Sequence, residues 1–166
     1  MKEIFLTGGT GFIGSHVVKQ LINQGRILNC LKRSGSYPKI DFDKQPNWID
    51  GEYEDDFQDI FKKCNLLIHL ASHSTNYPYD TLENCLLNNV TRPLAFLQKA
   101  KKSGIKKFII IGSGFEYGSS GNQFKYIPTN APLIPKMTYS VSKAVGFLVF
   151  SQWALENKLK IKYLRL

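Results

Sequence analysis

The sequence predicts an α/β fold built on a doubly wound parallel sheet with the strand order 3-2-1-4-5-6. Short apolar segments alternate with segments of helical periodicity, which favours parallel strands joined by helices. A glycine-rich turn joins the first of these strands to the first helix. The 166 residues are 43% hydrophobic, which suffices for one good core. We therefore expect a single domain spanning residues 1–166.

The first half of the chain is expected to contain four strands and two helices. Ile13, Val17 and Leu21 recur on one face of the first helix, and Gly25 is placed to end it. A polar loop then runs from the second strand to Pro46. The expected strands are residues 3–7, 27–31, 47–53 and 66–71, and the expected helices are residues 12–24 and 55–63.

The second half is expected to add two helices and two strands. Leu82, Leu86 and Val90 recur at helical spacing and predict a helix that ends before Gly104. The uninterrupted apolar run of residues 108–111 is typical of a fully buried strand. After a loop that contains several prolines, the sequence predicts a helix over residues 139–157 and a sixth strand over residues 160–166.

Residues 7–14, TGGTGFIG, have the spacing of a nucleotide-binding turn. Glycines three apart let the backbone turn tightly, approach a pyrophosphate and pack helix on strand. A helix that begins near Gly11 would direct free N–H groups at the phosphates. The alternative is a glycine-rich turn without a ligand, but the strand before it and the helix after it favour a nucleotide. The predicted cofactor-binding residues of this loop are Gly8, Gly11, Phe12, Ile13 and Gly14.

The net charge of +9 raises the question of nucleic-acid binding. The densest lysine cluster, between Lys99 and Lys107, spans a helix end and a strand start and has no interleaved aromatic platform. We therefore expect no nucleic-acid partner. No apolar stretch approaches the roughly 18 residues that would span a membrane, and the N-terminus has no signal-peptide pattern. These features predict a cytoplasmic protein without a membrane partner.

The three cysteines, Cys30, Cys64 and Cys85, lack the spacing of metal ligands. Two of them adjoin apolar, strand-like runs. We expect them to be reduced and structural, and we expect no metal site.

Three residues are predicted to be catalytic. Tyr139 and Lys143 lie four residues apart near the start of a helix, so they share one face. An ammonium group one turn away favours the phenolate form of a tyrosine, which can exchange a proton with a substrate hydroxyl or ketone. Ser113 follows the buried strand of residues 108–111, at the sheet edge where ligands bind.

These motifs together resemble the short-chain dehydrogenase/reductase superfamily, and in particular its extended, nucleotide-sugar branch, the NAD-dependent epimerase/dehydratase family. The order Ser113, Tyr139, Lys143 is similar to the superfamily's catalytic triad. The resemblance implies a Rossmann fold. Further similar elements are Pro135-x-x-x-Tyr139-x-x-Ser142-Lys143, Tyr117-Gly118, Asn89-Val90 and His69-Leu70-Ala71. The cofactor contacts that it implies outside the glycine loop come from Leu70, Ala71, Asn89, Tyr139 and Lys143.

The resemblance implies an NAD(P)-dependent oxidoreductase that acts on a nucleotide-activated hexose as a 4-epimerase or 4-ketoreductase, with a homodimer expected. Tyr139 would carry the proton, Ser113 would bond the reacting oxygen, and Lys143 would tune Tyr139 and hold the ribose. The sequence stops inside the sixth expected strand, so we expect the family's substrate-binding part to be absent from it. Two alternatives are a non-catalytic NADP sensor and an inactive fragment of such an enzyme.

The second strand ends in Lys32 and Arg33, where an NAD-dependent member would commonly carry an aspartate for the ribose 2′-hydroxyl. Basic residues suit a 2′-phosphate, so we expect NADP to be preferred, with NAD as the alternative. Two ordinary surface cations are the competing interpretation. Glu52 stands where the family often has an aspartate that binds adenine, so it is predicted to contact the cofactor.

The chain also departs from the family pattern. In the family's sugar 4,6-dehydratases, the catalytic hydroxyl is followed by Asp-Glu, the acid and base that eliminate water. Gly114 and Phe115 occupy those positions here and cannot transfer a proton, which disfavours elimination. Glu116 stands where the family usually has an apolar residue, and a substrate contact is the one role that the sequence suggests for it.

Overall fold

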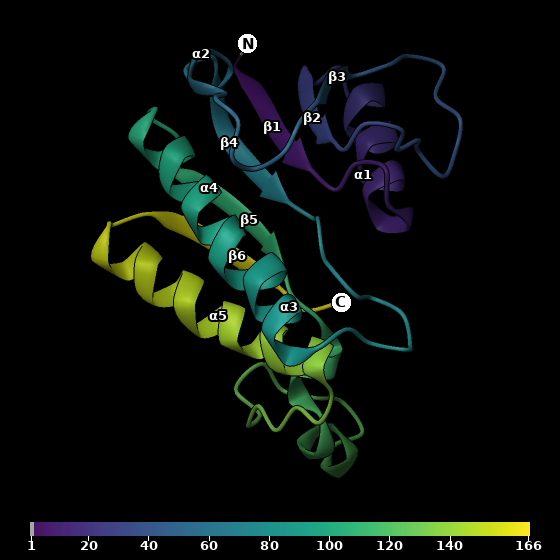
Figure 1. Ribbon diagram of the computed structural model, residues 1–166, viewed down its shortest axis with the longest axis vertical. Coiled ribbons are helices and arrows are strands. Elements are labelled where there is room, and N and C mark those ends of the chain that lie inside the picture. The colour runs from purple at the N-terminus through teal and green to yellow at the C-terminus, as the bar shows by residue number, and fades with distance from the viewer. Residues whose placement is uncertain (1) are drawn as a thin grey trace. The chain divides into compact units, whose positions relative to one another are not determined.

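The computed structural model describes residues 2–166 and confirms a six-stranded sheet in the order β3-β2-β1-β4-β5-β6 (Figure 1). The pairings of the first five strands with one another are parallel. The strands are β1 (Glu3–Thr7), β2 (Leu28–Lys32), β3 (Asn47–Asp50), β4 (Cys64–His69), β5 (Lys107–Ile111) and β6 (Lys160–Leu164). The helices are α1 (Phe12–Asn23), α2 (Gln58–Phe61), α3 (Leu82–Leu86), α4 (Arg92–Lys102) and α5 (Thr138–Glu156).

Three predicted strands, β3, β4 and β6, end earlier than expected, and two of them end where their pairing partners end. Thr7, the last residue of β1, pairs with His69, so β4 stops at His69 and not at Ala71. Lys32, the last residue of β2, pairs with Asp50, so β3 stops at Asp50. Alternating or apolar sequence shows where a strand can form, but the partner decides its length.

The described chain divides into two compact units. Unit 1 contains the residues up to Ala71 together with 95–110 and 159–162, and unit 2 contains residues 72–94, 111–158 and 163–166. The glycine loop belongs to unit 1, whereas the predicted catalytic residues belong to unit 2.

The core of unit 1 has an aliphatic part under α1 and an aromatic part at β1. Leu6, Val18 and Cys30 are wholly buried in the aliphatic part, which also includes Ile4, Leu28 and Ile68. Phe5 packs against three further rings, at centroid distances of 5.7 Å to Phe57, 4.8 Å to Phe61 and 5.8 Å to Phe96. Each fully buried Phe side chain stabilises the fold by about 1.5–3 kcal/mol. The two clusters fix β1, and therefore the start of the glycine loop that follows it.

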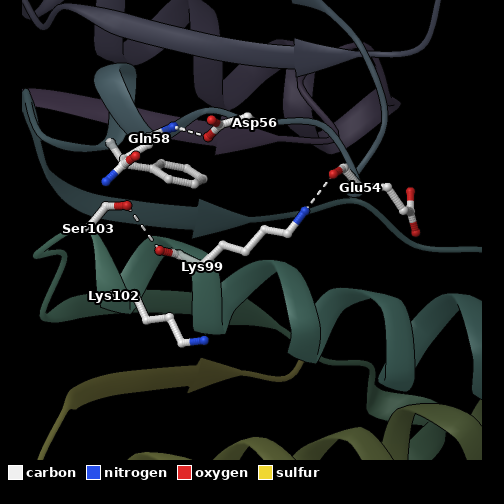
Figure 2. Close-up of a pocket in the computed structure, with 7 residues that line it drawn as sticks. Glu54, Asp56, Gln58, Lys99, Lys102 and Ser103 are labelled. Carbon is white, nitrogen blue, oxygen red and sulfur yellow. Dashed lines mark hydrogen bonds between the residues drawn. The ribbon is translucent and has the colours of Figure 1, made fainter.

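One exposed lysine of the lysine-rich helix α4 makes hydrogen bonds within the protein. The Lys99 ammonium group donates hydrogen bonds to the carbonyl oxygens of Tyr53 at 3.2 Å, Glu54 at 2.6 Å and Asp55 at 3.4 Å. Figure 2 shows the bond to Glu54 beside a pocket lined by Glu54, Asp56, Gln58, Phe61, Lys99, Lys102 and Ser103. Lys99 therefore ties α4 to the segment before α2.

Unit 2 is organised around α5. Helix α3 and the turn that follows it pack beside α5 (Figure 1). The sequence predicted one uninterrupted helix here, but residues Leu87–Thr91 form a π-helical turn between α3 and α4. Hydrophobic spacing does not report a single inserted residue in a helical turn, so the prediction missed it. Asn89 lies in this π-helical turn. Single π-helical turns within α-helices are frequent at functional sites.

Candidate functional site

The glycine loop of unit 1 has the backbone shape that its sequence predicted. Gly8 has a φ of +78°, and a Cβ there would overlap Leu70 and Ala71, which follow β4. A Cβ at Gly14 would overlap the Gly8 carbonyl, so both glycines are required for the chain to fold back on itself. Gly11 is exposed and precedes α1, whose first turn has no side-chain cap. The first N–H groups of α1 therefore suit an anionic ligand.

Ser15 holds this loop in place, and the sequence analysis did not identify it. Its buried hydroxyl lies 2.8 Å from the carbonyl oxygen of Gly11 and 3.2 Å from that of Gly9. The same hydroxyl oxygen accepts a hydrogen bond from the Lys39 N–H at 2.9 Å. The residue is a serine on the first turn of a helix, which is a common position, so its sequence carried no distinct signal.

The residues that follow β4 lie directly against the glycine loop. The Leu70 N–H donates to the carbonyl oxygen of Thr7 at 3.0 Å, which continues the pairing of β1 and β4 beyond the strands. Ala71 follows it, at the closest approach to Gly8. The loop and two of the predicted cofactor-binding residues therefore form one surface of unit 1.

Lys32 and Arg33 differ in their surroundings. The Lys32 ammonium group lies 2.5 Å from an Asp50 carboxylate oxygen, and its side chain is 15% exposed. Arg33 is exposed. The Glu52 N–H donates to Asp55 at 2.9 Å, in the turn that follows β3. Of the two basic residues, Lys32 already has an acidic partner, so Arg33 is the better candidate for binding an additional anion.

Unit 2 brings the predicted catalytic residues to buried positions. Ser113, Tyr139 and Lys143 are 7%, 7% and 5% exposed. Ser113 begins the short 3₁₀ turn Gly114–Tyr117, and its Oγ accepts a hydrogen bond from the Phe115 N–H at 3.2 Å. This bond leaves the hydroxyl proton of Ser113 available for donation.

Lys143 carries a buried ammonium group. Its Nζ donates to the carbonyl oxygen of Ile111 at 2.6 Å. Burial lowers the pKa of Lys143 from its ordinary value to about 8, while the negative charge of Glu116 opposes this shift. A lysine of this pKa is mostly charged at neutral pH and can lose its proton in mildly alkaline solution.

Asn89, predicted to contact the cofactor, forms hydrogen bonds within the protein. Its Oδ1 accepts from the His73 N–H at 2.7 Å, and its Nδ2 donates to the His73 carbonyl oxygen at 3.1 Å and to Ser142 Oγ at 3.0 Å. The amide thereby joins the segment after β4 to α5, one residue before Lys143. A cofactor contact from Asn89 stays a prediction.

An aromatic ring that the sequence analysis missed lies against Tyr139. The rings of Tyr79 and Tyr139 are stacked, with centroids 5.9 Å apart and planes inclined by 11°. The loop that carries Tyr79 is closed by His73 Nε2, which lies 2.8 Å from Asp80 Oδ2, and by Thr138, which donates to the Asp80 carbonyl oxygen. Hydrogen bonds from Asn84 and His73 and from the Thr81 backbone lower the pKa of Asp80.

The expectation for Glu116 was wrong. The sequence suggested a substrate contact, but the side chain is 0% exposed, and Ser113, Tyr163 and Arg165 bind its carboxylate. A group that no solvent reaches cannot touch a substrate. Its position among charged and polar partners explains why an apolar residue does not stand there.

Other features of the described residues bear on the remaining expectations. Cys30, Cys64 and Cys85 are buried and form no disulfide, and burial raises the pKa of Cys30 to about 12 and that of Cys64 to about 11. Within residues 2–166, no group of three or more His, Cys, Asp or Glu side chains gathers in a way that could hold a metal ion. No helix in the described part of the chain is long and apolar enough to cross a membrane.

Comparison with known proteins gives consistent matches. Residues 4–166 match the NAD dependent epimerase/dehydratase family. The chain is 31% identical over 119 residues to a putative dihydroflavonol 4-reductase of Synechocystis, covering 71% of this chain and 34% of that protein. It is 30% identical over 127 residues to a UDP-glucose 4-epimerase of Haemophilus influenzae, covering 69% of this chain and 38% of the relative.

A solved structure supports the same grouping. The UDP-glucose 4-epimerase of Thermotoga maritima, determined with UDP-glucose, superposes with a TM-score of 0.80 at 27% identity. The match covers 98% of this chain and 54% of that structure. The chain therefore spans about half the length of this structure and little more than a third of the two curated relatives.

Proposed function

Because the chain belongs to the NAD dependent epimerase/dehydratase family, we propose that it catalyses hydride transfer at C4 of a nucleotide-activated sugar, as a 4-epimerase or 4-ketoreductase. The observation that carries the proposal is the buried set of Ser113, Tyr139 and Lys143 in unit 2. The proteins named UDP-glucose 4-epimerase among its relatives support this substrate class.

In the proposed reaction, the oxygen of Tyr139 takes the proton of the sugar hydroxyl as the C4–H bond breaks, and it returns that proton when a ketone is reduced. The Ser113 hydroxyl donates a hydrogen bond to the same sugar oxygen. The Lys143 ammonium group stabilises negative charge on Tyr139. A bound nicotinamide would accept or supply the hydride. Gly114 and Phe115 offer no acid or base for the elimination of water.

Gly8, Gly11 and Gly14 would hold the cofactor's pyrophosphate in this proposal. The fit rests on the glycine loop, where side chains are excluded at Gly8 and Gly14, and on the uncapped start of α1. Phe12 and Ile13 would supply backbone N–H groups there, while Leu70 and Ala71 would flank the cofactor. Contacts from Glu52 to the adenine and from Lys143 to the ribose complete the proposal.

A direct assay tests this function. Purified protein is incubated with NADP⁺ or NAD⁺ and UDP-glucose, and the nucleotide sugars are separated to detect the C4 epimer or the 4-ketone. Formation of either product, and its loss in Ser113→Ala, would support the proposal. A protein that binds the dinucleotide tightly but converts no nucleotide sugar would instead favour the two non-catalytic alternatives, the NADP sensor and the inactive fragment.

We predict that NADPH raises the melting temperature more than NADH does, because Arg33 can pair with the 2′-phosphate. The side chain of Arg33 is exposed, whereas Lys32 is already paired with Asp50. Arg33→Ala should therefore reduce the preference about tenfold or more in Kd, and Lys32→Ala should reduce it less. Thermal shifts and titrations with both dinucleotides measure this. Equal binding of NADPH and NADH by the wild type would remove the assignment of these residues.

A further inference from the structure

Glu116 is a charged residue buried directly beside Ser113. Its Oε1 accepts hydrogen bonds from the Ser113 N–H and from the Tyr163 hydroxyl, each at 2.8 Å. Its Oε2 lies 2.6 Å from Arg165 Nε. Burying a carboxylate costs several kcal/mol unless it is paired and hydrogen-bonded, and all these partners are needed to offset that cost. An apolar residue at this position would leave the Arg165 guanidinium and the Ser113 N–H without this acceptor.

Arg165, the counterion of Glu116, is itself held in place by neighbouring aromatic rings. The Arg165 side chain is 13% exposed, and its guanidinium carbon lies 4.2 Å from the ring centroid of Phe147 and 5.1 Å from that of Tyr117. These rings come from α5 and from the 3₁₀ turn of Glu116. The ion pair is therefore fixed by packing on both sides, which gives its charges defined positions.

Tyr163 connects this ion pair to the helix that carries Lys143. Its hydroxyl lies 2.8 Å from Glu116 Oε1 and 3.1 Å from the carbonyl oxygen of Lys143. Burial, reinforced by the charge of Glu116, raises the pKa of the Tyr163 hydroxyl, which stays protonated and serves as a donor. Gly112 makes room for the arrangement, because a Cβ there would overlap both Tyr163 and the Glu116 carboxylate.

We propose that Glu116 is a positioning residue, whose carboxylate fixes the backbone of Ser113 and, through the Tyr163 hydroxyl, the turn of α5 that carries Lys143. A catalytic effect of Glu116 rests on the proposed function, whereas its contacts with Ser113, Tyr163 and Arg165 do not. Glu116 is the acidic group that acts on Lys143, and its effect opposes that of burial.

The charged and titratable groups linked to Lys143, directly or through Glu116, come from three parts of the chain. Glu116 lies in the 3₁₀ turn after β5, Tyr139 lies one turn earlier on α5, and Tyr163 and Arg165 lie in and just after β6. Arg165 is cationic, so with Glu116 removed it would add to the effect of burial and disfavour the ammonium form further. The sign of the expected change is therefore fixed: loss of the Glu116 charge lowers the pKa of Lys143.

The test follows the protonation of Lys143 directly, in protein labelled with ¹³C at lysine Cε. The Lys143 resonance is assigned by its loss in Lys143→Arg, and its shift is recorded against pH. The wild type should titrate with a midpoint near 8. In Glu116→Gln the midpoint should fall by about one pH unit or more. Ser120→Ala is the matched control, because it removes a buried hydroxyl of unit 2, bonded to the Tyr117 carbonyl, without changing a charge.

Equal midpoints in the wild type and Glu116→Gln, or an equal fall in Ser120→Ala, would overturn the proposal. Arg165→Gln provides a second variant should Glu116→Gln not fold: removing the cation should raise the Lys143 midpoint, and an unchanged or lower midpoint would count against an electrostatic role. In the nucleotide-sugar assay, the alkaline fall of kcat should move to lower pH in Glu116→Gln with KM little changed. An inactive wild type would contradict the proposed function, whereas the midpoint of Lys143 tests the role of Glu116 without any substrate.

Discussion

Replacing Tyr139 with phenylalanine is expected to lower the turnover of a nucleotide sugar by a factor of about a hundred or more, while cofactor affinity changes little. The substitution removes only the hydroxyl that exchanges the proton. The ring is 7% exposed and stacked on Tyr79, and phenylalanine preserves both its burial and its stacking. The fold of unit 2 should therefore be unaffected, and the whole effect should appear in kcat.

Tyr79→Phe is the matched control for this experiment. It removes a hydroxyl from the other ring of the same stacked pair and should retain most of the activity, since Tyr79 exchanges no proton in the proposed reaction. The measurements are kcat and KM with UDP-glucose, and the Kd of NADPH by titration. Near-normal turnover by Tyr139→Phe would refute the catalytic assignment of Tyr139.

The parts of the fold that follow from local sequence were predictable. Gly8 and Gly14 are required by a positive φ and by a close approach of the backbone, and only glycine meets those requirements. The alternation of apolar strands with amphipathic helices then predicted the parallel sheet and its strand order, which the structure confirms. The strand ends were less predictable, because β4 stops at His69, opposite Thr7, which is the last residue of its partner strand β1.

The partners of the site residues were not predictable, because they come from distant parts of the chain. Glu116 meets Arg165 across 49 positions, and Asn89 meets Ser142 across 53. No local pattern encodes such pairs. The sequence indicated that Glu116 is unusual at its position, but only burial shows that it binds within the protein and does not face a substrate. The stacking of Tyr79 on Tyr139 likewise depends on a loop whose closure no spacing indicated.

Replacing Gly11 with valine is expected to weaken cofactor binding at least about a hundredfold while the protein stays folded, because a branched side chain would occupy the space that the pyrophosphate needs. The backbone at Gly11 has φ −73° and ψ 171°, which any residue adopts. A Cβ there would have one close neighbour, the Gly8 carbonyl oxygen at 3.3 Å, so a small shift accommodates it.

Substitutions at two other glycines serve as controls that distinguish a clash with the ligand from a loss of folding stability. Gly14→Ala should destabilise the protein as well as abolish binding, because its Cβ would overlap the Gly8 carbonyl. Gly25→Ala, at a φ of +73° with no atom within 4 Å of its Cβ, should cost stability through backbone strain but leave cofactor affinity unchanged. Circular dichroism would report folding, and titration with NADPH would report binding. Undiminished NADPH binding by a folded Gly11→Val protein would show that residues 7–14 do not hold the cofactor's phosphates, and the assignment of the loop would have to be withdrawn.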